Sequence, residues 1–330
     1  MIAYIVRRLL LAIVTIWAIS VLSFVIIQLP PGDFVDAYIS RMSANGSAVS
    51  AEEAQSLRRL YGLDQPIYVQ YAKWMSRVAE GDFGDSMEWQ RPVTEVIGDR
   101  LWLTMVVSIA AIILTWGIAL PIGIYSAVRQ YSIGDYIFTF LGFLGIAIPN
   151  FLLALIIMYF SFKLFGTSIG GLFSAEYQLA PWSFAKLGDM LAHLPLPAFI
   201  LAVAGTAQLI RIMRANLLDE LRKPYVVTAR AKGLTEMRVI MKYPVRAALN
   251  PFASSLAYLF PYVVSGSIIV SLVLSLPTVG PLLLTSLIAQ DMFLAGTIVL
   301  MLGVMTVIGT FLSDLVLMWI DPRIRFQVDE

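Results

Sequence analysis

Residues 101–128 read LWLTMVVSIAAIILTWGIALPIGIYSAV and contain no charged residue and no histidine. A helix needs roughly 20 apolar residues to cross the hydrocarbon core of a bilayer, and this run is long enough. Because a lipid-exposed segment must satisfy its own backbone polar groups, we expect it to be helical. The sequence predicts an all-α integral membrane protein with six such helices. The other five apolar runs cover residues 9–29, 137–160, 191–210, 252–276 and 294–320.

The composition agrees with a membrane protein. Of the 330 residues, 59% are hydrophobic and 14% are charged, whereas an average soluble domain is roughly 45–50% apolar and about 25% charged. The net charge of +1 gives no electrostatic reason to expect a nucleic-acid partner. The chain has no cysteine and a single histidine, His193. The sequence therefore excludes disulfides, thiolate metal sites and cysteine nucleophiles, and it leaves little room for an imidazole metal site.

The basic residues predict the orientation of the spans. Residues 211–246, between spans four and five, carry nine Lys or Arg and three acidic residues. Arg7 and Arg8 precede the first span, and Arg129 follows the second. Because short loops rich in Lys and Arg stay in the cytoplasm, we expect both termini to be cytoplasmic. The first apolar run extends to residue 29, beyond the apolar core of a typical signal peptide, so we expect an uncleaved helix.

The segment 30–100 is long and mixed in charge, with seven basic and eleven acidic residues. It contains a predicted helix over Ala51–Tyr61, which Ser50 and Glu53 open in capping-box spacing. We expect a small ordered lobe outside the cytoplasm. A turn-rich stretch follows the helix, and its pattern favours a tight turn over a cation site. The acids and glycines of this stretch are Glu80, Gly81, Asp82, Gly84 and Asp85.

The chain lacks the motifs G-x-x-x-x-G-K-[ST], G-x-S-x-G and H-E-x-x-H, so we expect a protein that is not an enzyme. Ionisable residues are nearly missing from the six spans. Asp314 is the main exception, and it is either a functional intramembrane acid or an interfacial contact of Arg323 and Arg325. Because proton- and sodium-coupled carriers place ionisable groups at mid-membrane, this scarcity argues against a secondary carrier. A partner must then supply the energy.

One predicted cytoplasmic segment, residues 218–236, reads LDELRKPYVVTARAKGLTE. Pro224 suits the first turn of a helix, and Gly233 suits the left-handed residue that ends one. Small residues between them let another surface approach closely, and Thr235 starts a second helix through residue 241. We expect a helix–turn–helix between spans four and five. These properties alone leave two roles open, contact with a partner protein or contact with lipid headgroups.

Residues 228–233, Thr-Ala-Arg-Ala-Lys-Gly, resemble the EAA loop of binding-protein-dependent ABC importer permeases, in the form typical of the oligopeptide/dipeptide subfamily. That form commonly lacks the glutamate that names the motif, and Val227 stands at its place here. The resemblance covers nearly the whole chain, and the long first loop is similar to that of the B-type subunit. The other matching motifs are Tyr4-Ile5-Val6-Arg7-Arg8-Leu9-Leu10, Pro31-Gly32-Asp33, Tyr61-Gly62-Leu63-Asp64-Gln65-Pro66, Gly81-Asp82-Phe83-Gly84, Leu276-Pro277 with Gly280, and Asp321-Pro322-Arg323-Ile324.

This resemblance implies a type I ABC importer permease fold, in a multi-pass protein of a bacterial or archaeal cell (inner) membrane. The implied partners are a second homologous permease in a heterodimer, two cytoplasmic ATPase subunits, an extracytoplasmic substrate-binding protein and membrane lipid, with no nucleic acid. ATP and Mg would be held by the ATPase subunits, with no cofactor in this chain. The implied regions are an N-terminal transmembrane helix (1–30), an extracytoplasmic lobe (31–94), a five-helix ABC transmembrane type-1 domain (95–320) with a coupling loop at about 211–250, and a cytoplasmic tail (321–330).

The resemblance also implies that the loop transmits ATP-driven closure of the ATPase subunits. The residues implied in this coupling are Pro224, Tyr225, Thr228, Ala229, Arg230, Ala231, Lys232, Gly233, Leu234 and Glu236.

Candidates for the translocation path or its gate are Pro149, Asn150, Pro261 and Ser271. A proline inside a span produces either a local kink or a hinge. Many relatives have Glu-Thr where Ser271 and Leu272 stand, and Gly where Thr278 stands. The missing acid favours neutral or zwitterionic cargo. The resemblance implies peptide cargo, with oligosaccharides or opines as the alternative, while a secondary carrier or a membrane scaffold would be a different class of protein.

Overall fold

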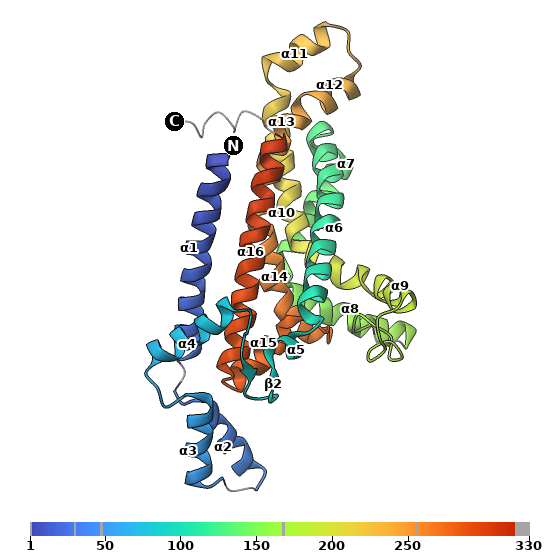
Figure 1. Cartoon of the computed structure of the whole chain (residues 1–330). Coiled ribbons are helices and arrows are strands. Elements are labelled where there is room, and N and C mark those ends of the chain that lie inside the picture. Colours follow the sequence, from blue (N-terminus) through green and yellow to red (C-terminus); the bar gives the residue numbers. More distant parts are fainter. Residues whose placement is uncertain (1, 30, 47–48, 167–168, 255, 321–330) are drawn as a thin grey trace. The chain divides into compact units, whose positions relative to one another are not determined.

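The computed structural model describes residues 2–29, 31–46, 49–166, 169–254 and 256–320, and this part of the chain is almost wholly helical (Figure 1). The elements in chain order are α1 (Ile2–Ile27), α2 (Phe34–Ala44), α3 (Ala51–Tyr61), α4 (Ile67–Ala79), β1 (Asp85–Ser86), β2 (Arg91–Pro92), α5 (Val93–Ile97), α6 (Arg100–Val128), α7 (Ile133–Ala147), α8 (Asn150–Phe165), α9 (Phe184–His193), α10 (Pro195–Leu221), α11 (Pro224–Ala231), α12 (Glu236–Lys242), α13 (Pro244–Ser254), α14 (Leu256–Val273), α15 (Val279–Ile288) and α16 (Met292–Ile320). The predicted tail 321–330 and the side chains of Pro261 and Asp314 lie outside the described residues.

Within the described residues, four helical segments are long and apolar enough to cross a membrane. They are Leu10–Ile27, Arg100–Val128, Phe184–Leu221 and Met292–Leu312. The pair α7 and α8 is a fifth if it is counted as one bent span. The chain is therefore an all-helical membrane protein with four or five candidate spans. The sixth predicted span, over 252–276, includes residues that the structure does not describe, so the count of six stays a prediction.

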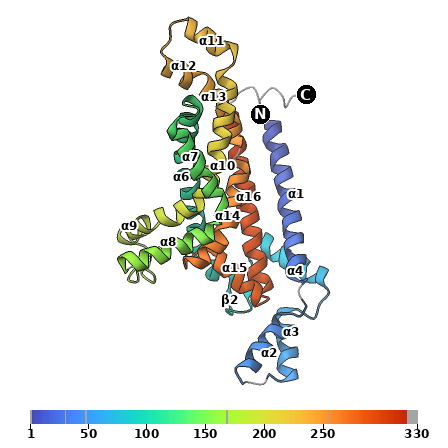
Figure 2. The same ribbon diagram turned by 180° about the vertical axis from the view of Figure 1, so that it is seen from behind.

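The predicted span over 137–160 is not one straight helix. It consists of α7 and α8, which meet at an angle of 102°, and Figures 1 and 2 show α8 leaving α7 sideways. Pro149 occupies the N-cap of α8, and Ile148 before it is extended, with φ −93° and ψ 116°. A proline cannot donate to the helical ladder and disfavours helical backbone in the residue before it, which explains the break. At Pro149 the kink is confirmed.

The chain divides into two compact units, and the first comprises residues 103–277 and 308–320 of the described chain. Its central element is α10, against which α7, α8, α9, α13 and α14 all pack. The helices approach closely at glycines. A Cβ on Gly145 of α7 would lie 2.9 Å from Val203 of α10, and one on Gly123 of α6 would lie 2.6 Å from Met213. Small residues let backbones approach in this way in membrane bundles.

A buried ion pair also joins α7 to α10. Asp135 is 3% exposed at its side chain, and Arg214 reaches it with two hydrogen bonds, from Nε at 3.0 Å and from Nη2 at 2.9 Å. The backbone N–H of Tyr131 donates to the same carboxylate. A bidentate geometry of this kind fixes the orientation of both side chains, so it sets the register between the two helices.

The second unit comprises residues 2–102 and 278–307. Here α1 and α4 pack together through Phe24 and Trp74, whose rings are stacked at 5.8 Å. The hydroxyl groups of Ser20 and Tyr71 are hydrogen-bonded at 2.8 Å. A Cβ on Gly296 of α16 would lie 3.4 Å from Trp74, so α16 also approaches this cluster closely. Residues 31–94 thus share a unit with α1 and part of α16, and their role as a separate outer lobe stays a prediction.

The predicted helix over Ala51–Tyr61 is confirmed as α3 with the same bounds. The hydroxyl of Ser50 accepts from the N–H of Glu53, and Gly62 ends the helix at a φ of +69°. The full capping box forms one helix earlier, where Asp33 and Asp36 each accept the other's backbone N–H at the start of α2. The sequence reasoning did not identify this second cap, although an acid at both positions was the available signal.

Candidate functional site

The segment between α10 and α13 forms the predicted helix–turn–helix. The first helix, α11, begins at Pro224, where the fixed φ of proline suits the first turn. The chain then turns at Gly233, whose φ is +75°, a conformation that costs little only for glycine. Thr235 takes the N-cap position of α12. The local structure predicted for residues 224–241 is therefore confirmed.

A small apolar core holds α11 against α12. Val226 and Val239 are fully buried, Ala229 is 5% exposed, and Leu234 and Tyr243 pack against them. The small side chain of Ala229 therefore serves contact between the two helices rather than contact with a partner. The two helices and this core form a unit that we call the α11–α12 hairpin, residues 224–242.

Polar contacts bind the ends of the hairpin. Arg230 donates to Glu236 through Nε at 3.0 Å and Nη2 at 2.6 Å, across the turn. Glu220, in the last turn of α10, accepts from Lys223 Nζ at 2.7 Å and from the Tyr225 hydroxyl. Burial and the hydrogen bond to Glu220 raise the pKa of Tyr225, so its hydroxyl stays protonated and acts as a donor. These bonds orient the hairpin on the end of α10.

The hairpin exposes three apolar side chains, which we call its outer face. Val227, Met237 and Met241 are 59%, 72% and 49% exposed. The same hairpin also exposes basic side chains, among them Lys232 and Arg238. An exposed apolar patch with a polar rim is typical of a surface that docks a protein. The sequence reasoning missed Met237 and Met241, although their spacing of four residues on a predicted helix was a signal that they share a face.

The other residues predicted for coupling all belong to the hairpin. Thr228 Oγ1 donates to the carbonyl of Pro224 at 3.1 Å, so it is engaged within its own helix. Leu234 is half-buried in the turn. Those with exposed side chains are Pro224, Tyr225, Thr228, Arg230, Ala231, Lys232 and Glu236.

The residues predicted for the translocation path are not joined by any hydrogen bond among the described residues. Pro149 and Asn150 lie at the bend between α7 and α8, and the Oδ1 atom of Asn150 is buried without a partner there. Ser271, near the end of α14, is fully buried, and its Oγ atom likewise has no partner among the residues that the structure describes. The side chain of Pro261 lies outside the described residues. Their role in transport stays a prediction.

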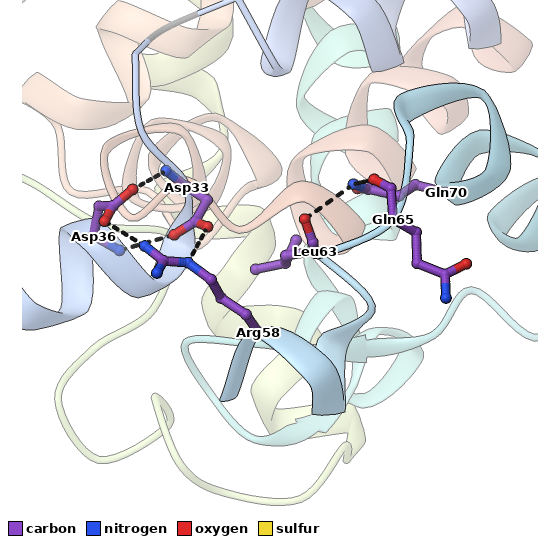
Figure 3. A network of polar contacts seen from close by, with 6 residues as sticks. All are labelled: Asp33, Asp36, Arg58, Leu63, Gln65 and Gln70. Atoms are coloured by element: carbon purple, nitrogen blue, oxygen red, sulfur yellow. Dashed lines mark hydrogen bonds and ion pairs between the residues drawn. The ribbon is translucent and has the colours of Figure 1, made fainter. Parts of the chain in front are cut away.

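Residues of α2 and α3 form a charged cluster (Figure 3). Arg58 donates to Asp33 at 2.8 Å and to Asp36 at 2.6 Å. Burial raises the pKa of Asp33, but the hydrogen bonds from Arg58 and from the backbone N–H of Asp36 outweigh it and hold the pKa below its usual value. The cluster therefore depends on an ionised carboxylate at Asp33.

A small polar pocket of about 80 Å³ lies beside this cluster in the second unit. Gln70 lines the pocket and donates to the carbonyl of Gln65 at 2.7 Å (Figure 3). Gln28 donates to Gln70 at 3.0 Å, and the buried Oε1 atom of Gln290 has no partner. The pocket has room for water-sized groups and offers them amide hydrogen bonds.

A buried carboxylate in the second unit ties the short hairpin of β1 and β2 to the start of α16. Asp291 is fully buried and accepts from Ser86 Oγ at 2.5 Å, from the Glu88 N–H at 3.1 Å and from the Leu294 N–H at 3.1 Å. Burial raises the pKa of Asp291, against the hydrogen bond from Ser86. Ser86 and Glu88 lie 205 and 203 positions away along the chain, so the sequence offered no signal for their contact with Asp291. Among the acids predicted for a tight turn, Asp82 accepts from the Gly84 N–H and pairs with Arg77, as a turn requires.

Comparison with known proteins finds two matching family models and several similar proteins. Residues 119–326 match the family model described as binding-protein-dependent transport system inner membrane component. Residues 1–109 match the model for the N-terminal part of such membrane components. The chain is 36% identical to the oligopeptide transport system permease protein AppB of Bacillus subtilis (strain 168), over 99% of this chain and 100% of that protein. It is 32% identical to the inner membrane ABC transporter permease protein YejB of Escherichia coli O157:H7, over 98% of this chain and 99% of that protein.

Proposed function

Because this chain belongs to the family of binding-protein-dependent transport system inner membrane components and is a non-catalytic permease subunit of an ABC importer, we propose that it forms part of a path for peptides. Support for peptide cargo comes from relatives that match over nearly their whole length, one of which is an oligopeptide permease. Oligosaccharides or opines are the alternative cargo. Uptake by the complete importer of a labelled peptide, in competition with each of these classes, would decide between them.

The proposed topology has six spans in a cell (inner) membrane, with both termini in the cytoplasm. It is supported by the four or five candidate spans, by the apolar run over 252–276 and by the basic residues of 211–246. The proposed regions are the first helix (1–30), an outer lobe (31–94), a five-helix domain (95–320) and a cytoplasmic tail (321–330). Labelling of single introduced cysteines from either side of the membrane tests this, since the chain has no cysteine of its own.

The proposed partners are a second homologous permease, two ATPase subunits that hold ATP and Mg, an external binding protein and membrane lipid, with no cofactor in this chain. The observation that carries the ATPase contact is the α11–α12 hairpin. Its own core leaves Val227, Met237 and Met241 on the outer face, and these apolar side chains, with the exposed basic residues of the same hairpin, fit a groove with acidic edges. The hairpin would then transmit movement to α10 through the bonds of Glu220.

The test uses the complete importer in proteoliposomes and measures uptake together with ATP hydrolysis stimulated by the binding protein. Met237→Asp places a charge in the proposed contact and should lower both rates at least about tenfold, since a charge buried in an interface without a partner costs several kcal/mol. Gly233→Asp should uncouple hydrolysis from uptake, because its left-handed backbone is strained with a side chain. Met237→Leu is the matched control. Wild-type rates in both aspartate variants would refute the contact.

The serine at position 271 bears on the charge of the cargo. If Ser271 faces it, the path lacks the acid that many relatives place there, and a cation would lose water without a fixed counter-charge. The importer should then prefer neutral or zwitterionic solutes, and Ser271→Glu should shift the preference towards cations. Competitive uptake of neutral and cationic analogues, with a binding protein that accepts both, measures this. A wild-type preference for the cation would contradict it.

A further inference from the structure

A second pocket lies in the first unit, away from the α11–α12 hairpin, and has a volume of about 350 Å³. Its walls come from α6, α7, α8 and α10 and are apolar apart from one threonine. The lining side chains of Leu141, Leu144 and Phe199 are 54%, 40% and 44% exposed, so the pocket opens on the surface of the unit. It lies along α6 and α10, which are candidate membrane spans.

Water is not a stable occupant of this pocket. A buried water needs about two to four polar partners, and the walls of this pocket offer it only the hydroxyl of Thr206. At the depth of the hydrocarbon core, the pocket must therefore be filled by apolar matter, either a lipid chain or a helix of another subunit. Two polar groups along α10 distinguish these occupants.

The first polar group is the hydroxyl of Thr206. Thr206 lines the pocket and is 8% exposed, yet its Oγ1 atom has no hydrogen-bond partner in the described part of the chain. A buried hydroxyl without a partner costs roughly 1–3 kcal/mol. An occupant that brings a hydrogen-bond acceptor to this point would remove the penalty, and the side chains of a purely apolar helix would not.

The second polar group is the guanidinium of Arg211. Arg211 lies four residues after the lining residue Ala207, so it continues the pocket face by one helical turn. It is exposed, and it has no acidic partner among the residues that the structure describes. The nearby Arg214, in contrast, is paired with Asp135. A free positive charge at the end of an apolar pocket complements an anionic group.

We propose that this pocket is a binding site for one acyl chain of an anionic phospholipid, with its phosphate at Arg211 and an ester carbonyl at Thr206. The order of the groups along α10 matches the order in such a lipid. Arg211 and Thr206 are separated by about 7.5 Å along the helix axis, and the apolar lining at Val203 and Phe199 lies deeper. The proposal rests on α6 and α10 spanning the membrane and is independent of the cargo and of the ATPase contact.

Gly142 is a position at which a substitution can fill the pocket. It lines the pocket on α7, and a Cβ there would have only Ala207 nearby, at 3.9 Å. The site therefore accepts a side chain at its wall, and Gly142→Leu should fill the space without displacing the backbone. Thr206→Val keeps the shape of its side chain and removes the hydroxyl.

The experiment uses the complete importer in phosphatidylcholine nanodiscs. The probe is phosphatidylglycerol with a photoreactive group in one acyl chain, and the comparison probe is phosphatidylcholine with the same chain. Cross-linked peptides are located by mass spectrometry. We expect labelling of α7 and α10 around Gly142 and Val203, stronger with phosphatidylglycerol. Arg211→Gln should lower the phosphatidylglycerol signal about fivefold, since a basic residue near an anionic lipid contributes about 1 kcal/mol.

The controls separate the site from general lipid contact. Arg222→Gln removes another exposed arginine near the end of α10 and should change nothing. Gly142→Leu should abolish labelling at the pocket with both probes. Equal labelling by the two lipids, or an unchanged signal in Arg211→Gln, would overturn the proposal. So would a cross-link from a photoreactive residue at position 142 to the second permease. If Gly142→Leu does not assemble, the ratio of the two probes in wild type and Arg211→Gln decides alone.

Discussion

Two pairs of short helices, α2 with α3 and α11 with α12, use an arginine in different ways. In the first pair, Arg58 bonds Asp33, whose side chain is 26% exposed and which also caps α2. In the second pair, Arg230 bonds Glu236, which is 55% exposed, while the buried Val226 and Val239 hold the helices together. In α2–α3 the ion pair involves the residue that caps a helix, whereas in α11–α12 the ion pair is exposed and the apolar core holds the helices together. Sequence inspection shows an arginine and nearby acids in both, so only burial and the number of acids that each arginine bonds separate the two cases.

The largest effect is expected from the core of the α11–α12 hairpin. Val239→Asp buries a carboxylate without a partner, which costs several kcal/mol after relaxation, so the hairpin should open. Hydrogen exchange of residues 224–242 in the free subunit should become fast. Met237→Asp on the exposed face is the matched control and should leave exchange in the free subunit unchanged. Slow exchange in Val239→Asp would show that the apolar core is not what holds the hairpin.

A smaller effect is expected from Asp33→Ala in the α2–α3 pair. The change removes the N-cap of α2, which contributes about 1 kcal/mol, and it leaves Arg58 with one acid instead of two. Exchange in residues 34–44 should accelerate about fivefold to tenfold. The exposed Asp64 serves as the control, because Asp64→Asn removes a charge that has no ion pair in the described chain. Equal acceleration of exchange in the two variants would show that Asp33 contributes no more to stability than an exposed surface charge does.

Acid should destabilise the α2–α3 pair. The pKa of Asp33 in the folded protein lies below its ordinary value of 3.8. The stability that Asp33 contributes is therefore present above pH 3.8 and is lost as pH falls through the folded-state pKa. Asp291 has the opposite sign, because burial raises its pKa and its protonated form is favoured by folding. Exchange in α2, corrected for the intrinsic rate, should therefore rise in acid before exchange at β1 and β2 does. The reverse order would contradict these signs.

The smallest effect is expected from the exposed pair Arg230 and Glu236. Arg230 lowers the pKa of Glu236, but solvent screens both side chains, and such pairs contribute roughly 0.2–1 kcal/mol. Glu236→Gln should therefore change exchange in 224–242 by less than about fivefold. A double-mutant cycle with Arg230→Gln measures the pair directly, and the corresponding cycle for Arg58 and Asp33 should give the larger coupling. A larger coupling free energy for Arg230 and Glu236 would show that the exposed pair is the stronger of the two.

Features that are determined by residues within one helical turn could be predicted from the sequence. The bounds of α3, the start of α11 at Pro224 and the left-handed turn at Gly233 follow from caps and from the backbone preferences of proline and glycine. The family was also visible in the order of short motifs along the chain. At the candidate coupling site, the sequence identified the hairpin but not its outer face. Ala229, predicted to let a partner approach, is buried against α12, and Met237, for which no role was predicted, is exposed.

The sequence by itself determined that the chain is a helical membrane protein, because apolar runs of sufficient length have no other stable form in a bilayer. It also determined where a helix could break, as at Pro149. Only the tertiary structure decided the direction of that break, the 102° between α7 and α8. It alone paired Asp135 with Arg214 and Asp291 with Ser86, which lie 79 and 205 residues apart. Burial of these carboxylates, and the space left between α7 and α10, depend on packing between distant segments, which no local pattern of residues encodes.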